Sequence, residues 1–228
     1  MKRLFLAVIA APVALPALAQ QYPSRPVRIL VGFAPGGGVD ISARLLASKL
    51  SEYLGQQFLV ENKPGAGTNI AAAEVVRSAP DGYTLFMNSP AVVINTALYA
   101  KPPYQMRDFT GVSIFAATTN LLVVPAAFEA RTVQDLVRIA KEKPGSLNYA
   151  SAGQGTTQHL AGELFKLRSG TNIVHVPYKG SGPSMTALLG GEVQLSFINP
   201  DAAGGHVKAG KVCALPVTDS KRTELMAD

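Results

Sequence analysis

Two glycine-rich segments carry the residue types best suited to binding a small anion. We name residues 32–40 (GFAPGGGVD) the first glycine loop and residues 151–160 (SAGQGTTQHL) the second glycine loop. Glycine lets the backbone turn tightly and approach a ligand without a β-carbon in the way, and serine and threonine hydroxyls add hydrogen-bond donors. Each segment can therefore direct several donors at one carboxylate. An ordinary turn into a capped helix explains each segment equally well, with Asp40 as the cap in the first.

The sequence lacks the motifs of nucleotide binding and of common catalytic sites. The first glycine loop has no Lys-Ser/Thr pair after its last glycine, and neither loop has G-x-G-x-x-G spacing. There is no G-x-S-x-G, S-x-x-K or H-E-x-x-H segment, and His159, His175 and His206 have no partner at metal-ligand spacing. We therefore expect no metal, no cofactor and no catalysis. The alternative is a secreted hydrolase with a dispersed Ser-His-Asp triad.

His159 follows the second glycine loop's threonines and has two interpretations. Its side chain either lines the ligand or packs against the fold. Glu163 lies one helical turn further on, and this spacing predicts a surface pair between the two side chains.

Each glycine loop lies between a predicted strand and a predicted helix. Strand 27–33 and helix 39–54 flank the first loop, and strand 147–150 and helix 156–167 flank the second. Both loops therefore place backbone N–H groups at the positive end of a helix dipole, where anions bind favourably.

The remaining segments continue this alternation of strands and helices, which predicts a layered α/β fold with a largely parallel sheet. Further strands are expected at 58–60, 84–87, 174–176, 195–198 and 212–215, and further helices at 69–78, from Thr132 with Asp135 as its capping partner, 184–189 and 202–209. Cys213, the only cysteine, excludes an intramolecular disulfide and is expected to be a packed thiol in the last strand.

The first residues predict export. Lys2 and Arg3 precede an apolar run at 4–18, and Ala17 and Ala19 form an A-x-A cleavage site, which together indicate a signal peptide over 1–19 cleaved near Ala19. A buried N-terminal helix is the alternative. Without the signal peptide the net charge is about +4, from scattered basic residues, which disfavours nucleic acid and favours small anions.

An ordered series of motifs resembles one known family. The motifs are YPSRPVRILV at 22–31, FAPGGGVD at 33–40, ENKPGAG at 61–67, PDGYTL at 80–85, the second glycine loop, and HVPYKG at 175–180. Together they resemble the Bug receptors, the substrate-binding components of tripartite tricarboxylate transporters. The series covers almost all of the chain after residue 19.

The resemblance implies a periplasmic binding protein of type II, with two α/β lobes that enclose a ligand cleft. The expected ligand is a small carboxylate, such as a di- or tricarboxylate, an amino acid or an aromatic acid. Expected partners are membrane permease subunits or a sensor protein, and we expect a monomer. The resemblance implies that main-chain N–H groups and ordered water form many of the hydrogen bonds to the ligand.

The resemblance also implies a set of ligand-binding residues. In the first lobe they are Phe33, Ala34, Pro35, Gly36, Gly37, Asn88 and Ser89, and in the second Ser151, Gly153, Gly155, Thr156, Thr157, Tyr178, Asn199 and Asp201. Tyr178 is expected to form a wall of the cleft. Asp201 either pairs with an amino group of the ligand or caps the helix that follows, and we favour the cap.

The predicted organisation is a signal peptide at 1–19, a first lobe at 20–119 and a second lobe at 120–228, with the crossover inside 114–124. Members of the family continue past the segment equivalent to 214–222. We therefore expect that the return segment completing the first lobe is missing, and a shortened, non-functional receptor is a further alternative.

Overall fold

The computed structural model describes residues 22–215. The predicted signal peptide lies outside the described residues. Among those residues, no helix combines the length and apolar composition that crossing a membrane requires.

The first lobe is a three-stranded parallel sheet covered by helices. Strand β1 (Val27–Val31) lies between β2 (Phe58–Asn62) and β3 (Thr84–Met87) and runs parallel to both. The helical elements are α1 (Gly38–Leu54), α2 (Asn69–Arg77), α3 (Ala91–Leu98) and the 3-10 turns η1 (Ala66–Thr68) and η2 (Met106–Asp108). Alternate residues of β1 pack with α1, so the start of α1 is fixed against the carboxyl end of the central strand.

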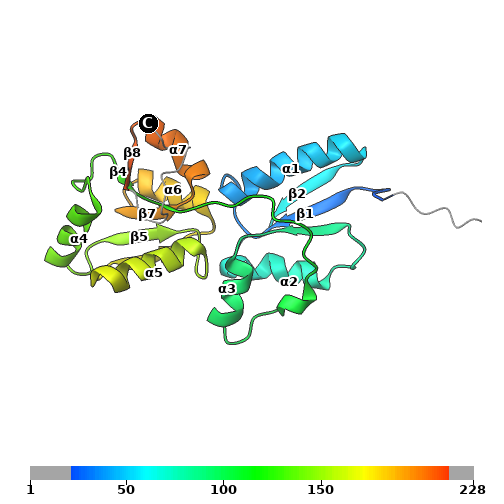
Figure 1. Cartoon of the computed structure of the whole chain (residues 1–228), viewed down its shortest axis with the longest axis horizontal. Coiled ribbons are helices and arrows are strands. Elements are labelled where there is room, and N and C mark those ends of the chain that lie inside the picture. The colour runs from blue at the N-terminus through cyan, green and yellow to red at the C-terminus, as the bar shows by residue number, and fades with distance from the viewer. Residues whose placement is uncertain (1–21, 216–228) are drawn as a thin grey trace, which may run out of the picture.

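The second lobe is a mixed five-stranded sheet in the order β6-β5-β7-β4-β8. Its elements are β4 (Leu121–Pro125), α4 (Val133–Glu142), β5 (Asn148–Ser151), α5 (Thr157–Ser169), β6 (Val174–Pro177), α6 (Ser181–Leu189), β7 (Leu195–Ile198), α7 (Pro200–Lys208) and β8 (Val212–Leu215). Strand β5 runs parallel to β6 and β7, whereas β4 is antiparallel to β7 and β8. The two lobes lie side by side in Figure 1.

Both faces of the second sheet are buried. Along β4, Leu122 and Val124 belong to one apolar cluster, and Leu121 and Val123 belong to another. Because successive side chains of a strand point to opposite faces, these clusters lie on the two sides of the sheet. Helices α4 and α5 cover the first cluster, and α6 and α7 cover the second.

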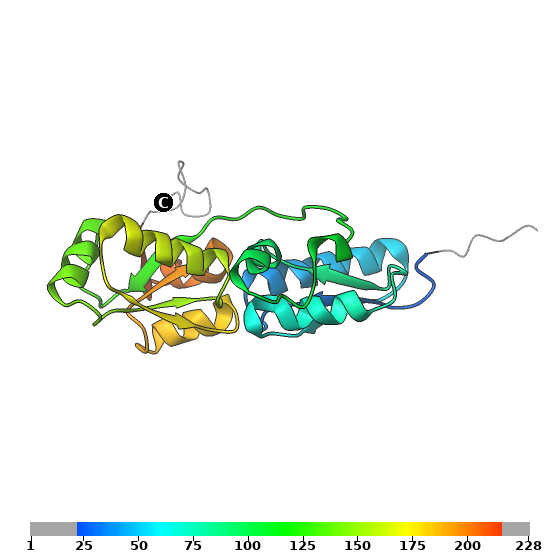
Figure 2. The ribbon, with the colours of Figure 1, turned by 90° about the horizontal axis from the view of Figure 1, so that it is seen from below.

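Residues 110–120 connect the lobes without forming a helix or a strand. The connection runs along one face of the molecule in Figure 2. Val112 and Ile114 are 85% and 89% exposed, whereas at the end of the stretch the Asn199 amide donates to the Thr119 carbonyl. The first half of the predicted crossover 114–124 is therefore not a strand, and β4 begins at Leu121. The division of the lobes at 119/120 stays a prediction.

The predicted elements are found with shifts of no more than three residues at any end, and the α/β class is confirmed. Thr132 and Asp135 form the expected capping box at the start of α4. Strand β1 ends at Val31 rather than at Phe33, and Cys213 in β8 is partly rather than fully buried. Helix α3 was not predicted.

Candidate functional site

The first glycine loop turns directly from β1 into α1. The helix cap is Gly37, and Asp40 lies in the first turn, so the expectation that Asp40 is the cap is wrong. Its buried carboxylate instead accepts the Gly36 N–H at 3.0 Å and the Asn62 amide at 2.9 Å. Burial alone would raise the Asp40 pKa, but hydrogen bonds from Arg44, Gly36 and Asn62 outweigh it and hold the pKa below its ordinary value. Asp40 therefore stays ionised and fixes the shape of the loop.

The second glycine loop is held together by its own polar groups. Thr156 caps α5, because its hydroxyl oxygen accepts the His159 N–H at 3.3 Å and its hydroxyl donates to the Gly153 carbonyl at 2.7 Å. The Gly153 N–H donates to Ser151 Oγ at 3.1 Å, and the Gly155 N–H donates to His159 Nδ1 at 3.3 Å. Several groups that the sequence assigned to the ligand thus serve the loop itself.

Both helix starts leave other N–H groups without an acceptor. The first N–H groups of any α-helix have no partner inside the helix. Within residues 22–215, no backbone or side-chain acceptor binds the N–H groups of Gly38 and Val39 in α1 or of Thr157 and Gln158 in α5. These four groups at positive helix ends are the donors available to an anion.

Replacing Thr156 with alanine is expected to lower the free energy of unfolding by about 1 to 2 kcal/mol, because α5 loses its cap. Denaturation in urea measures the loss. Thr157→Ala is the matched control, since within residues 22–215 the Thr157 hydroxyl forms a hydrogen bond only with Gln158 Oε1, at 3.3 Å. Equal losses in both variants would contradict the assignment of Thr156 as the cap.

Three aromatic rings stack beneath the second glycine loop. The His175 ring lies 4.8 Å from the Tyr149 ring and 4.3 Å from the His159 ring, measured between centroids. His175 Nε2 is 2.7 Å from Ser151 Oγ. The predicted surface pair of His159 with Glu163 is wrong, because the Glu163 carboxylate binds the Tyr149 hydroxyl at 2.8 Å and Lys166 at 3.0 Å.

The Ser151–His175 contact does not make the hydrolase alternative stronger. Ser151 is fully buried, so a substrate cannot reach its hydroxyl. Within the described residues, no carboxylate forms a hydrogen bond with His175 that would complete a triad.

Acidification is expected to destabilise the fold through His175. Burial, and next the neighbouring His159, lowers the pKa of His175 from 6.5 to about 4. Between these pH values the unfolded chain binds a proton that the folded chain does not, so stability is fully present above about pH 6.5 and falls toward pH 4. After discounting for partial exposure, we expect a loss of roughly 2 kcal/mol. Urea denaturation at several pH values measures it, and His175→Gln should remove this component. Parallel curves for the two proteins would contradict the prediction.

The two lobes touch through the first glycine loop. The Ala34 N–H donates to the Lys179 carbonyl at 2.7 Å. A β-carbon added to Gly182 would lie 2.9 Å from the carbonyl oxygen of Pro35. Ala152 of the second glycine loop packs into the apolar cluster of the first lobe. Backbone therefore meets backbone at this contact.

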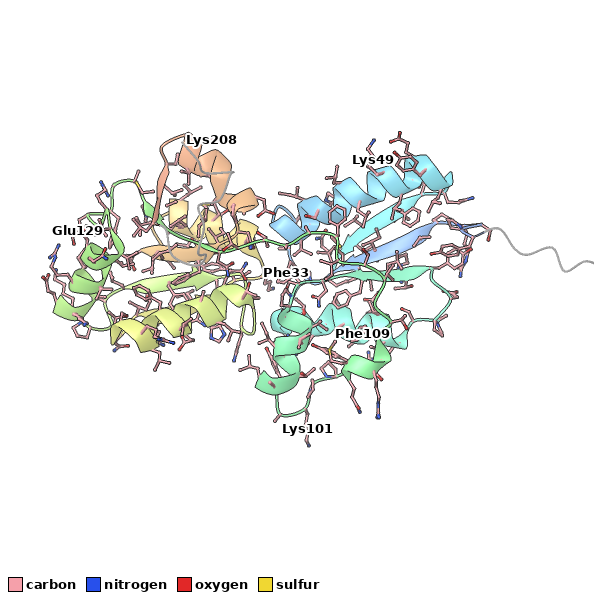
Figure 3. The ribbon with its side chains drawn as sticks, viewed as in Figure 1. Phe33, Lys49, Lys101, Phe109, Glu129 and Lys208 are labelled. Carbon is pink, nitrogen blue, oxygen red and sulfur yellow. The ribbon has the colours of Figure 1, made fainter. Side chains whose placement is uncertain are left out.

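Phe33 lies where the lobes meet in Figure 3, yet its side chain is 6% exposed and packs within the first lobe. Its carbonyl accepts the Asn62 amide at 3.0 Å. The structure thus uses this side chain as part of the core.

A second contact between the lobes is formed by η1 and α3. A β-carbon on Gly67 would lie 2.2 Å from the carbonyl oxygen of Gln154, and one on Gly155 would lie 1.9 Å from Asn95 Oδ1. The Asn95 amide donates to the Gly67 carbonyl and to Asn69 Oδ1. The sequence did not predict this contact between the lobes. The one feature that could have indicated it is the glycine-rich turn at 63–67.

Four buried side-chain atoms of the first lobe have no hydrogen-bond partner within the described residues. They are Thr68 Oγ1, Asn95 Oδ1, and both polar atoms of Asn88. Asn88 follows β3, as predicted, and Ser89 Oγ accepts the Ala91 N–H at the start of α3. Buried polar atoms without partners are costly, so they mark a place where water or a ligand is expected to bind.

Tyr178 lines a groove of about 670 Å³ together with Pro35 and Gly36. Its hydroxyl donates to Glu192 at 3.1 Å, so the ring points toward α6 and its following turn. The structure therefore brings Tyr178 next to the first glycine loop, and its role as a wall of the ligand cleft stays a prediction.

Asn199 and Asp201 lie at the start of α7. Asn199 Oδ1 accepts the Gln158 amide at 2.7 Å, and its own amide donates to the Thr119 carbonyl at 3.1 Å. Asp201 is in the first turn rather than at the cap, and its Oδ1 accepts the Ala202 N–H at 3.0 Å. Its other oxygen lies beside α1, because a β-carbon on Gly38 would be 2.0 Å from it.

Comparison with known proteins gives a consistent result. A family model described as tripartite tricarboxylate transporter family receptor matches residues 42–228. Among solved structures, R. palustris Rpa4515 with adipate is 36% identical with a TM-score of 0.80, over 88% of this chain and 68% of that one. MatC from Rhodopseudomonas palustris with bound malate is 31% identical with a TM-score of 0.84, over 88% and 69%.

The periplasmic binding protein BugD is 33% identical with a TM-score of 0.79, over 88% of this chain and 68% of that one. The predicted periplasmic-binding-protein fold with two α/β lobes is thereby confirmed. The matching family and the BugD structure are thus described as a transporter receptor family and a periplasmic binding protein. The chain spans 60 to 67% of the length of the first curated relatives that it matches.

Proposed function

Because the chain belongs to the tripartite tricarboxylate transporter receptor family, as its motif series predicted, we propose that it is a periplasmic receptor that binds a small carboxylate between its lobes. The carrying observation is that two helix starts, one in each lobe, have N–H groups without acceptors. They are Gly38 and Val39 in α1, and Thr157 and Gln158 in α5.

The start of α5 suits a carboxylate better than a neutral or cationic ligand, whereas the start of α1 also has the Asp201 carboxylate beside Gly38. Backbone N–H groups and the positive ends of α1 and α5 favour negative charge. Buried polar atoms of Thr68, Asn88 and Asn95 in the first lobe have no partner within the described residues, and water or a ligand group would satisfy them. Two relatives contain adipate and malate, which are both dicarboxylates. We also propose that the signal peptide directs export and that the receptor delivers its ligand to membrane permease subunits or to a sensor protein. The proposal includes no catalytic activity.

Calorimetry with the full chain tests the proposal. Malate, adipate, succinate, citrate and aspartate are the probes, and adipamide, the neutral diamide of adipate, is the control. Saturable binding of at least one acid, with none of the diamide, supports a carboxylate receptor. A folded sample that binds none of these acids contradicts it.

Thr157→Pro tests the assigned donors. Proline is tolerated at the first position of a helix, where it removes only an N–H without an acceptor, and Thr156 already has the extended backbone that must precede it. Loss of one hydrogen bond to a charged group is expected to weaken binding of the identified acid by about 10-fold or more. Thr157→Ala keeps the N–H, and Val133→Pro makes the same change at the start of α4; both should bind like the unmodified chain. Unchanged binding by Thr157→Pro would exclude this donor.

A further inference from the structure

Two histidine rings lie beneath the second glycine loop and have no part in the donor set just described. The His159 and His175 rings stack at a centroid distance of 4.3 Å with an angle of 26° between their planes. His159 comes from the first turn of α5 and His175 from β6, so the pair links the start of α5 to the neighbouring strand.

Each ring fixes one N–H group of the loop. His159 Nδ1 accepts the Gly155 N–H at 3.3 Å. His175 Nε2 is bonded to Ser151 Oγ at 2.7 Å, and Ser151 Oγ accepts the Gly153 N–H at 3.1 Å. Both glycines have positive φ, 130° for Gly153 and 78° for Gly155. Because glycine moves freely between positive and negative φ, these bonds select one of several accessible loop shapes.

These bonds decide which donors face the ligand. With the Gly153 and Gly155 N–H groups turned toward the lobe, Thr157 and Gln158 carry the N–H groups that remain without acceptors. A change in either imidazole contact would let the glycines rotate and would move the start of α5.

We propose that His159 and His175 are positioning residues, a stacked neutral pair that holds the second glycine loop in the shape that binds the carboxylate. The consequence for ligand affinity rests on the proposed function. The shape of the loop does not, and it can be measured without a ligand.

Neutrality follows from the contacts. His159 Nδ1 can accept the Gly155 N–H only while it carries no proton, and two charged rings at 4.3 Å would repel. The titratable groups that face the pair are Tyr149 on β5 and Glu163 and Lys166 on α5. Glu163 favours the charged form of both imidazoles, but Tyr149 and Lys166 already bind its carboxylate, and burial of the rings outweighs its effect. Burial accordingly lowers the pKa of both histidines.

Amide hydrogen exchange of the ¹⁵N-labelled full chain tests the inference. His159→Phe keeps a flat ring for stacking but offers no acceptor, whereas His159→Asn places an oxygen near the position of Nδ1. We expect the protection factor of the Gly155 amide to fall at least 10-fold in His159→Phe and less than 3-fold in His159→Asn. His206→Phe, a histidine change on α7, is the control and should leave Gly155 protection unchanged.

Malate binding and pH complete the test. If the unmodified chain binds malate, affinity should fall about 10-fold in His159→Phe and less than 3-fold in His159→Asn. If it binds no carboxylate, the proposed function fails while the exchange data still decide the positioning role. In the unmodified chain, protection of Gly153 and Gly155 should be lost together as the pH falls toward 4. If His159→Phe does not fold, the joint loss of Gly153 and Gly155 protection in the unmodified chain tests the positioning role by itself. Unchanged Gly155 protection in His159→Phe, or independent loss of the two amides, overturns the inference.

Discussion

Replacing Gly67 with alanine is expected to hold the two lobes apart and to weaken carboxylate binding at least 100-fold. The added β-carbon would lie 2.2 Å from the carbonyl oxygen of Gln154, which belongs to the backbone of the other lobe and cannot swing aside. The lobes must therefore separate near η1, and a ligand held from both sides loses one set of contacts. Small-angle scattering should show a larger radius of gyration, and calorimetry should show the loss of affinity.

Gly55→Ala is the matched control for this change. Gly55 and Gly67 have similar left-handed backbones, with φ of 67° and 59°, so alanine adds a similar strain of about 1 kcal/mol at each. A β-carbon on Gly55 meets nothing within 4 Å. Both variants should lose about the same stability through backbone strain, and only Gly67→Ala should also lose contacts between the lobes, change the scattering profile and weaken binding. If the two bind the identified acid equally well, the contact between η1 and Gln154 does not govern closure.

Local sequence patterns predicted the sheet strands well because each strand is a short apolar run between turn residues. Strands β3, β7 and β8 have the predicted bounds, and the capping box of Thr132 and Asp135 is present. These features depend on residues only a few positions apart, so they can be predicted from a short stretch of sequence.

Helix α3 shows where local patterns fail. Its sequence AVVINTAL is rich in β-branched and apolar residues, without the polar face of a typical surface helix. Asn95 in this helix contacts Gly67 and Asn69, and Gly155 of the other lobe lies beside its Oδ1. Its structure therefore depends on tertiary contacts that no local window contains.

The candidate site shows the same division. The two glycine loops were located from residue type and from their place between strand and helix, which are local properties. Contacts in the folded chain decide which donors of the loops stay free. His175 of β6 forms a hydrogen bond with Ser151, and Asp40, which was expected to cap the helix, accepts the N–H of Gly36 instead. Contact with a ligand at the predicted residues remains a proposal.

Replacing Gly162 with alanine is expected to lower the free energy of unfolding more than the other substitutions that we propose in the second lobe. Gly162 lies in α5, and a β-carbon there would lie 2.2 Å from Cε2 of Tyr149. The Tyr149 ring cannot move away easily, because it is fully buried, stacks on His175 at 4.8 Å and meets the edge of Phe197 at 5.9 Å. Helix α5 must therefore shift away from β5.

Overpacking of this kind costs about 3 kcal/mol, although alanine is otherwise the better helix former by about 1 kcal/mol. Gly204→Ala supplies the control, since a β-carbon at this position of α7 meets nothing within 4 Å and should stabilise the chain. Urea denaturation should give changes of opposite sign. The shift of α5 should also lower amide protection in the second glycine loop, because Thr156 and His159 move with the start of the helix. Equal stability of the two variants would show that the gap between α5 and β5 is wide enough for a side chain at position 162.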